Sequence, residues 1–310
     1  MTQAQQVARA VATGVLGRDP GPMTRAESIS HEVFVGDEAV VKVIGAGEHP
    51  RLEREIGLGP FLPAGLTAPL LSSGVHSIDG GEVRYACYAR VPGAAPGMGL
   101  PGVDEVTACS LAEQAVRRLS LLHGWVPDGD ASRILAERLD HGGFTGREGL
   151  LAEIEGVAVA DRDGVVSPVL LDGLRGIGER ASAYASREVP VHADCHWGNW
   201  LAADGILTAL LDFEWARFGE PMDDWFFVIA DSGEHVAAVL DVVAGLTSIS
   251  PERLRAECEV REASYVTADI RLALTDPGAP GWLLPQRLAR LNELIMERVW
   301  WRSGAGTRAI

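Results

Sequence analysis

The residue types best suited to chemistry in this 310-residue chain are gathered between positions 192 and 214. His192 and Asp194 form a His-x-Asp pair, and Asn199 follows five residues after the aspartate. A strand-like apolar run then leads to Asp212, which begins the sequence Asp-Phe-Glu. One carboxylate can accept the proton of a hydroxyl group, while an amide and a second carboxylate supply hard oxygen ligands to Mg²⁺. The segment therefore predicts phosphoryl transfer from a magnesium-bound nucleotide.

Two other interpretations fit the same segment when it is taken alone. Alternation along a strand would place His192, Asp194 and His196 on one face, and histidine and carboxylate are ordinary ligands of zinc or iron. A metal-dependent hydrolase could use such a trio. A His-x-Asp pair also arises by chance as a buried polar group. Asn199 and the Asp-Phe-Glu sequence, at the distance that phosphoryl transfer needs, favour the first interpretation.

A second feature is the choice of cation. The chain has 26 arginines and a single lysine, Lys42, inside an apolar strand-like run at 39–44. A lysine ammonium is a compact point charge on a thin stem, which suits contact with a phosphate oxygen better than a planar guanidinium. The alternative is an edge-strand lysine that faces water. Because arginine serves wherever a surface cation suffices, the exclusivity of Lys42 favours the phosphate contact.

Together these motifs resemble those of the aminoglycoside phosphotransferase and choline kinase superfamily, relatives of the protein kinases. There the two loops usually read His-Gly-Asp-x4-Asn and Ile-Asp-Phe/Trp-Glu/Asp; here Ala193 stands at the glycine position and Glu214 at the acidic one. The resemblance runs from about residue 26 to residue 230. It implies an α+β, two-lobed protein-kinase-like fold. A small antiparallel β-sheet lobe would span residues 1–92 and a larger, mainly helical lobe residues 93–310.

The resemblance also implies the roles of the loop residues. Asp194 would act as the catalytic base on the acceptor hydroxyl, and His192 would support its loop by hydrogen bonding. Mg²⁺ would be bound by Asn199, Asp212 and Glu214. The phosphate donor would be ATP or GTP.

In the same superfamily a strand lysine contacts the α- and β-phosphates and is held by a glutamate from the following helix. Lys42 is the lysine, and Glu53 and Glu55 are the two candidates for the glutamate. Residues two apart on a helix point in different directions, so only one can face the lysine. The Arg-Glu-Ile setting and its distance to Pro69 resemble the spacing in that superfamily better with Glu55 as the partner.

Two further nucleotide contacts are implied by position. The segment in the place of the phosphate-covering loop contains Ser30 and His31 and lacks a Gly-x-Gly-x-x-Gly motif, so an ordinary turn is the alternative there. Backbone amides and Ser30 could contact a phosphate. A strand that ends in Pro-Gly resembles the hinge whose backbone binds adenine, and its hinge residues would be Tyr88, Ala89 and Arg90.

Composition restricts the class of protein. With 47% apolar residues the chain is expected to be globular, and a net charge of −16 argues against a nucleic acid or an anionic membrane as partner. There is no uncharged apolar stretch of about 18 residues, and because the first residues lack a basic start and an apolar segment, we do not expect them to act as a secretory signal. Four scattered cysteines fit reduced thiols. We expect a cytoplasmic monomer or homodimer.

The acidity is unevenly distributed. Residues 1–95 carry 8 basic and 10 acidic groups, whereas residues 96–310 carry 19 and 33, a net charge of −14. An electronegative cleft would attract a cationic acceptor; simple solubility charge is the alternative. The side chains that could meet a cation or stack on a ring, or else serve as helix surface and core, are Glu262, Asp269, Glu293, Glu297, Trp197, Trp200, Trp300 and Trp301.

Periodicity gives the expected elements. A first amphipathic helix would be capped by Thr2, and a hairpin turn would include Asp79 and Gly80. Asp224 would be the N-cap of a helix and therefore structural. The expected strands are 32–35, 38–44, 70–76 and 83–91. The other expected helices lie at 49–58, 106–123, 170–187, after 223, at 251–264 and at 285–302.

The sequence as a whole predicts an ATP- or GTP-dependent small-molecule kinase. The acceptor would be a hydroxylated, cationic molecule, with an aminoglycoside-type antibiotic favoured. A metabolic amino alcohol, amino sugar or sugar is the alternative within enzymes. A non-catalytic nucleotide-binding relative that regulates a partner is the alternative outside them.

Overall fold

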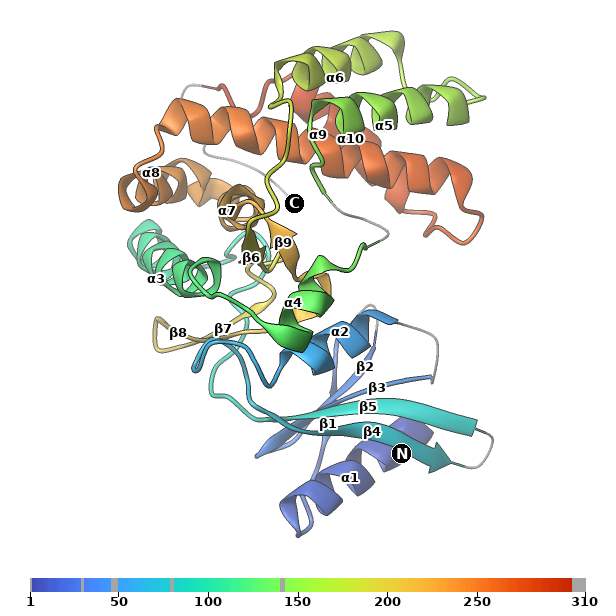
Figure 1. The fold of residues 1–310 in the computed structure, drawn as a ribbon, viewed down its shortest axis with the longest axis vertical. Coiled ribbons are helices and arrows are strands. Elements are labelled where there is room, and N and C mark those ends of the chain that lie inside the picture. Colours follow the sequence, from blue (N-terminus) through green and yellow to red (C-terminus); the bar gives the residue numbers. More distant parts are fainter. Residues whose placement is uncertain (1, 29–30, 46–49, 79–80, 140–142, 303–310) are drawn as a thin grey trace.

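The computed structural model describes residues 2–28, 31–45, 50–78, 81–139 and 143–302 (Figure 1). Its helices are α1 (Gln3–Leu16), α2 (Pro50–Leu58), α3 (Glu105–His123), α4 (Gly129–Ala136), α5 (Arg147–Ala160), α6 (Pro168–Arg180), α7 (Pro221–Ala230), α8 (Val236–Thr247), α9 (Pro251–Thr275) and α10 (Leu283–Ile295), with the short 3-10 helices η1 (Phe213–Trp215) and η2 (Gly233–His235). Its strands are β1 (Thr24–Ala26), β2 (Glu32–Val35), β3 (Ala39–Gly45), β4 (Leu70–Ile78), β5 (Gly81–Ala89), β6 (Val189–Val191), β7 (Trp200–Ala203), β8 (Ile206–Leu210) and β9 (Arg217–Gly219).

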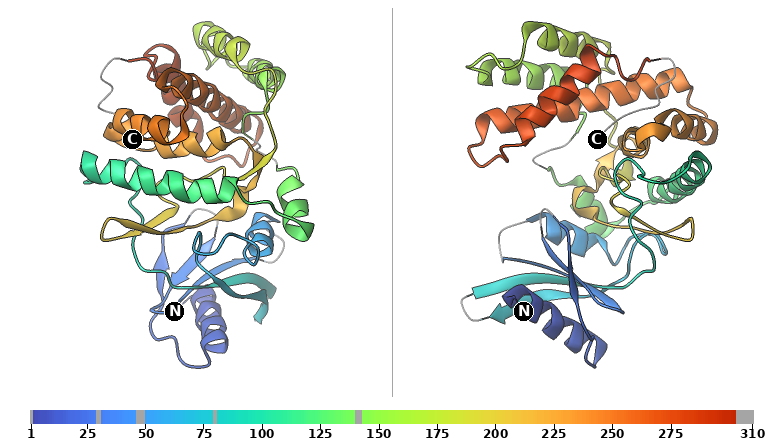
Figure 2. Two further views of the ribbon diagram at one scale, coloured as in Figure 1. Left: turned by 60° about the vertical axis from the view of Figure 1, so that its left-hand side comes forward. Right: turned by 180° about the vertical axis from the view of Figure 1, so that it is seen from behind.

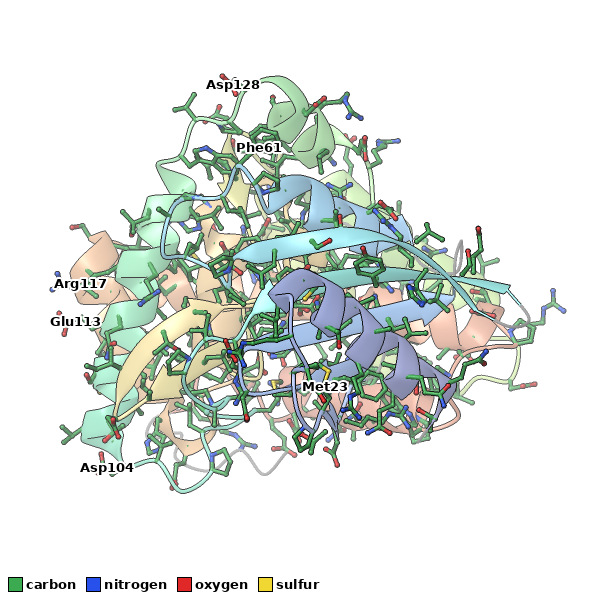
Figure 3. All side chains as sticks on the ribbon, turned by 90° about the horizontal axis from the view of Figure 1, so that it is seen from below. Met23, Phe61, Asp104, Glu113, Arg117 and Asp128 are labelled. Atoms are coloured by element: carbon green, nitrogen blue, oxygen red, sulfur yellow. The ribbon has the colours of Figure 1, made fainter. Side chains whose placement is uncertain are left out.

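The first five strands form one antiparallel sheet in the order β1-β2-β3-β5-β4, drawn in blue and cyan in Figure 1. Alternation along β3 gives this sheet two covered faces. Val41 and Val43 pack with α1, as does Met23, which is labelled in Figure 3. Ile44 packs with α2 on the opposite face. Lys42 shares that second face, so its ammonium is directed toward α2 and the helical region.

Helix α2 lies between the sheet and the helical region (Figure 1). Its buried Arg54 donates to three main-chain carbonyls outside the sheet: those of Ala216 at 3.0 Å, of Glu137 at 3.1 Å and of Ile134. Gly57 permits the close approach, because a Cβ there would lie 2.7 Å from the Ile134 side chain. The helix is therefore bound to both parts of the molecule.

The remainder of the chain is mainly helical, with two short antiparallel pairs, β6 with β9 and β7 with β8. Asp104 caps α3 by accepting from the Thr107 amide at 2.7 Å. Helices α5, α6, α9 and α10 lie at the end farthest from the sheet, as both views in Figure 2 show. Within the described ranges, no helix is both long and apolar enough to cross a membrane.

The expected fold class is confirmed: a small antiparallel sheet is joined to a larger helical region. Thr2 caps α1, accepting from the Gln5 amide at 3.2 Å, as predicted. Several predicted helix limits were wrong. The alternation of apolar and polar residues marks the end of a helix poorly where other parts of the protein pack against more than one face of it. The expected helix at 170–187 is Pro168–Arg180, that at 251–264 continues to Thr275, and that at 285–302 ends at Ile295. Helices α4, α5 and α8 were not predicted, and the predicted turn at Asp79 and Gly80 lies outside the described residues.

Candidate active site

The loop that follows β6 carries the first group of predicted site residues. Asn199 donates from its side-chain nitrogen to the Asp194 carbonyl at 2.8 Å and to Asp194 Oδ2 at 3.2 Å. Ala193 adopts a φ of 63°, the left-handed region that the usual glycine enters without strain. This turn reverses the chain between β6 and the Asp194 carboxylate. The structure thus brings Asp194 and Asn199 into direct contact.

Asp224 holds this loop in place, and its predicted role as an N-cap was wrong. Helix α7 begins three residues earlier, with Glu220 at the N-cap position. The Asp224 carboxylate is completely buried and accepts from the amides of Ala193 at 2.7 Å and His192 at 3.1 Å. It also bonds His123 Nε2 at 2.8 Å. These hydrogen bonds keep the pKa of Asp224 below its usual value although burial opposes this, so the loop is anchored by a buried anion.

His192 connects the two functional loops. Its Nδ1 accepts from the Asp194 amide at 3.2 Å, so its Nε2 carries the proton and donates to the Leu211 carbonyl at 2.8 Å. The Leu211 amide in turn donates to the Asn199 carbonyl at 2.7 Å. The next residue, Asp212, has a φ of 69°. His192 therefore makes hydrogen bonds to both loops, and both of its ring nitrogens are engaged within the protein.

Lys42 meets the second loop at the junction of sheet and helical region. Its Nζ lies 2.6 Å from Glu55 Oε2, 3.2 Å from Asp212 Oδ1 and 4.0 Å from Glu214 Oε1. Glu55 is therefore the partner, whereas Glu53 binds Arg84 at the surface. Burial lowers the pKa of Lys42, but the adjacent carboxylates outweigh burial and raise it, so the lysine stays charged.

Three carboxylates in this junction have the chemistry of a magnesium site. Oxygen atoms of Glu55, Asp212 and Glu214 lie within 4.8 Å of one another. The predicted ligand set contains Asn199 instead of Glu55, and the Asn199 side-chain oxygen is left available because its nitrogen donates to Asp194. Hard oxygen donors fit Mg²⁺. Lys42 Nζ lies closer to Glu55 than to Asp212, at 2.6 Å against 3.2 Å, and the donor types of Asn199, Asp212 and Glu214 fit a magnesium ion.

The acidic groups around this junction perturb one another. Burial and the charge of Asp212 raise the pKa of Glu214 to about 8 and raise that of Asp194 well above its usual value. Lys42 outweighs burial at Asp212 and keeps its pKa low. Burial and mutual repulsion therefore disfavour the ionised forms of Glu214 and Asp194 in this structure, and a bound cation would favour them.

Two main-chain amides in the predicted adenine hinge already donate hydrogen bonds within the protein. The Tyr88 side chain is buried, the Ala89 amide donates to the Pro69 carbonyl at 2.8 Å, and the Arg90 amide donates to Glu38 at 2.8 Å. Neither amide can bond adenine without losing a hydrogen bond of the sheet. Val91 follows these residues in the chain. No described residue accepts from its amide, and its side chain packs beside the cluster that contains Tyr88 and Ile44.

The phosphate-loop prediction is tested only in part. Ser30 lies outside the described residues. The next residue, His31, is buried, and its Nε2 lies 3.1 Å from Glu214 Oε1. The segment therefore reaches the carboxylates that face Lys42, which is where nucleotide phosphates would need to bind.

The alternative metal site at His192, Asp194 and His196 does not assemble. These residues lie in a loop after β6 instead of along a strand, and both His192 nitrogens are engaged within the protein. His196 accepts from the Gly198 amide through Nδ1 at 3.1 Å and places Nε2 3.9 Å from Asp194 Oδ1. Burial, reinforced by His192, lowers the pKa of His196 to about 4, so this ring is neutral at physiological pH.

A cleft of about 2040 Å³ opens beside Asp194 and His196 and extends between α4, α5, α7, α9 and α10. Among the described residues that line it are nine arginines and nine carboxylates. The charge excess of residues 96–310 is therefore not concentrated here. The predicted acceptor residues Glu262, Asp269 and Glu293 line the cleft. Glu297 pairs instead with Arg302, outside the lining.

The four tryptophans that were candidates to stack on a ring mostly pack within the protein. Trp197, Trp200 and Trp300 are buried in the main core. Trp301 is partly exposed and donates to Glu259 at 2.9 Å.

The family model of the phosphotransferase enzyme family matches residues 24–257. The chain belongs to this family. No curated protein matches the phosphotransferase in sequence. Several solved structures share its fold.

Three of these structures illustrate the range of the similarity. The GDP complex of aminoglycoside 2'-phosphotransferase-IIIa has a TM-score of 0.69 and 16% identity, with 96% of this chain and 100% of that chain covered. ADP-bound aminoglycoside phosphotransferase APH(2'')-Ib gives 0.63 and 16%, with 94% and 97% covered. Macrolide 2'-phosphotransferase MphH from Brachybacterium faecium gives 0.63 and 16%, with 91% and 97% covered. At such identities the likeness shows the fold of the phosphotransferase alone.

Proposed function

We propose that this phosphotransferase moves the γ-phosphoryl group of ATP or GTP to a hydroxyl group of a small molecule. The observation that carries the proposal is the contact between Lys42 and Asp212, 3.2 Å apart although 170 residues separate them in sequence. It joins a phosphate-binding cation to a metal-binding carboxylate. Asp194 lies on the adjoining loop, which the Leu211–Asn199 hydrogen bond ties to Asp212. Donor and acceptor sites would therefore share one junction.

Each residue has a defined task in this proposal. Lys42 binds phosphate oxygens and is oriented by Glu55. A magnesium ion, held by Asn199, Asp212 and Glu214, would neutralise charge on the transferred group. Positioning and electrostatic stabilisation account for most of the catalysis in such reactions.

Asp194 is the proposed general base. Its Oδ2 accepts from Asn199, which fixes the carboxylate, while Oδ1 faces the cleft near His196. The acceptor hydroxyl gives its proton to Asp194 as its oxygen bonds to the γ-phosphorus. The bond to the β-phosphate oxygen breaks, and a nucleoside diphosphate leaves. A raised pKa makes Asp194 a stronger base than an exposed aspartate.

The adenine or guanine ring would lie against the hinge segment, residues 88–91. We assign its hydrogen-bond donor to the Val91 amide instead of the Ala89 or Arg90 amide, since both of those are engaged in the sheet. The cluster around Tyr88 and Ile44 would supply the apolar wall.

For the acceptor we propose a class of molecule, and for the location a cellular compartment. An aminoglycoside-type antibiotic is supported by structures with this fold, including a streptomycin–ATP complex and a hygromycin B complex, and a macrolide by another. A metabolic hydroxyl compound is the second candidate. We propose a cytoplasmic enzyme, because nucleoside triphosphate is supplied there and the cysteines are unpaired. The lobes would meet near residue 92.

Incubation of the purified protein with MgATP or MgGTP and a panel of hydroxylated acceptors tests the proposal. Mass spectrometry should detect a phosphorylated acceptor, formed in equal amount to the nucleoside diphosphate. Asp194→Asn is the matched control, since it keeps the shape of the side chain but removes the base. Nucleotide binding without transfer to any acceptor would instead support a non-catalytic nucleotide-binding relative.

A further inference from the structure

The carboxylates on the far wall of the cleft are held by arginines of the same chain. Arg290 on α10 binds Glu293 at 2.6 Å and also binds Glu262 on α9. Arg287, one turn earlier, binds Asp269 at 2.6 Å. Glu262 accepts a further hydrogen bond from the Trp300 indole. Each of these three carboxylates therefore has a cationic partner within the protein.

The pairing follows from the register of two adjacent helices. Glu262 and Asp269 are seven residues apart on α9, which places them on one face of that helix. Arg287 and Arg290 are three residues apart on α10 and face them. All four residues line the cleft. The arginines thus stand where the ammonium groups of a cationic ligand would otherwise bind.

Displacing these arginines would be unfavourable. The Arg290 side chain is only 22% exposed and that of Glu262 only 4%. A ligand ammonium could reach Glu262 only by separating it from Arg290, which would leave this poorly hydrated guanidinium with Glu293 as its one remaining carboxylate partner among the described residues. The free energy lost when such a buried ion pair is separated exceeds the free energy gained from the new contact with the ligand.

We propose that the acceptor of this phosphotransferase is a neutral or singly charged hydroxyl compound, and that Arg287 and Arg290 exclude polycations from the cleft. The inference rests on the proposed function, because it takes the cleft beside Asp194 as the acceptor site. It opposes the cationic acceptor that the total charge of residues 96–310 led us to expect, and with it the aminoglycoside-type antibiotic that the family resemblance favoured. A macrolide or a sugar-like metabolite satisfies the proposal, and a polyamine antibiotic does not.

The test measures polycation binding directly and does not need turnover. Isothermal titration of the full chain with streptomycin or hygromycin B, in the presence of a non-hydrolysable ATP analogue, should give a dissociation constant weaker than about 1 mM for the wild type. Arg290→Gln frees two carboxylates and should tighten binding at least about tenfold. Arg287→Gln frees only Asp269 and should give a smaller gain.

Arg175→Gln on α6 is the matched control. Arg175 also holds two carboxylates, Glu155 at 2.8 Å and Asp172 at 2.9 Å, but it does not line the cleft. This variant loses the same charge and should bind the polycations as weakly as the wild type. Arg287 is more exposed than Arg290, so Arg287→Gln preserves the test if Arg290→Gln does not fold.

Two results would overturn the inference. One is micromolar binding of either polycation by the wild type, and the other is equal affinity in the Arg287, Arg290 and Arg175 variants. Failure of the proposed function is a separate observation, since it appears as the absence of phosphoryl transfer to any acceptor, whatever the titrations give.

Discussion

Asp224→Asn tests whether the catalytic loop is held by a buried anion. The asparagine oxygen can keep the hydrogen bond from the Ala193 amide, but an NH₂ group replaces the oxygen that accepts from the His192 amide at 3.1 Å. His123 can adopt the tautomer with its proton on Nδ1, so that Nε2 accepts from the new NH₂ group. The His192 amide cannot adapt, so it becomes a buried donor without an acceptor.

The magnitude follows from that single orphaned group. A buried unsatisfied donor costs about 1–3 kcal/mol, so we expect a loss of about 2 kcal/mol of unfolding free energy, or roughly 30-fold in the folding equilibrium. For a chain of this size that is about 3 °C in Tm. Displacement of the turn at Ala193 should also misplace Asp194, and we expect kcat to fall at least about tenfold.

Differential scanning calorimetry and steady-state kinetics measure the two effects. Asp172→Asn on α6 is the matched control, because Asp172 likewise lies near the start of a helix that begins with proline. Its side chain is 74% exposed, so the same substitution should change Tm by less than about 1 °C. If the two variants behave alike, Asp224 acts only on its helix, and the anchoring role assigned to it is wrong.

Three further predictions address the other residues of the site. Asp194→Asn should lower kcat by about 10²–10⁴-fold with little change in nucleotide affinity; wild-type turnover would remove it from the role of base. Lys42→Arg should lower kcat/KM for the nucleotide at least about tenfold, because a planar fork replaces a point charge among three carboxylates, and unchanged kinetics would argue against the phosphate contact. The lowered pKa of His196 means that the folded protein resists its protonation, so its contribution to stability is complete above about pH 6.5 and is lost as pH falls toward 4. His196→Asn should therefore lose less unfolding free energy than the wild type between these pH values, by on the order of 2 kcal/mol in chemical denaturation; parallel curves would contradict this.

The parts of the site that could be predicted were those in which chemistry dictates residue type. The single lysine and the Asp-Phe-Glu sequence can be recognised from the sequence alone, and the fold then brings Lys42 and Asp212 together. Asp224 was misread because a carboxylate at the start of a helix is a common cap, and the sequence does not show which distant amides it accepts from. The hinge residues stay a prediction; the sequence could not show that main-chain hydrogen bonds occupy the amides of Ala89 and Arg90, because such pairing does not depend on side-chain identity.

The charge of the cleft was unpredictable for a related reason. A count over residues 96–310 gives the net charge of a region but not the pairing within it. Glu262 and Arg290 are 28 residues apart, and only the packing of α9 against α10 shows that they neutralise each other.

The anchoring of α2 by Arg54 has a consequence for control of the enzyme. Arg54 and Glu55 are neighbours on one helix, so the residue that orients Lys42 is fixed beside a residue that is bound to Ala216, two positions after Glu214. The helix cannot swing outward to separate the lysine from its glutamate without first breaking three hydrogen bonds of a buried guanidinium. An enzyme built in this way would keep Lys42 and Glu55 paired. Its output would follow the supply of its two substrates, with no off state created by moving that helix.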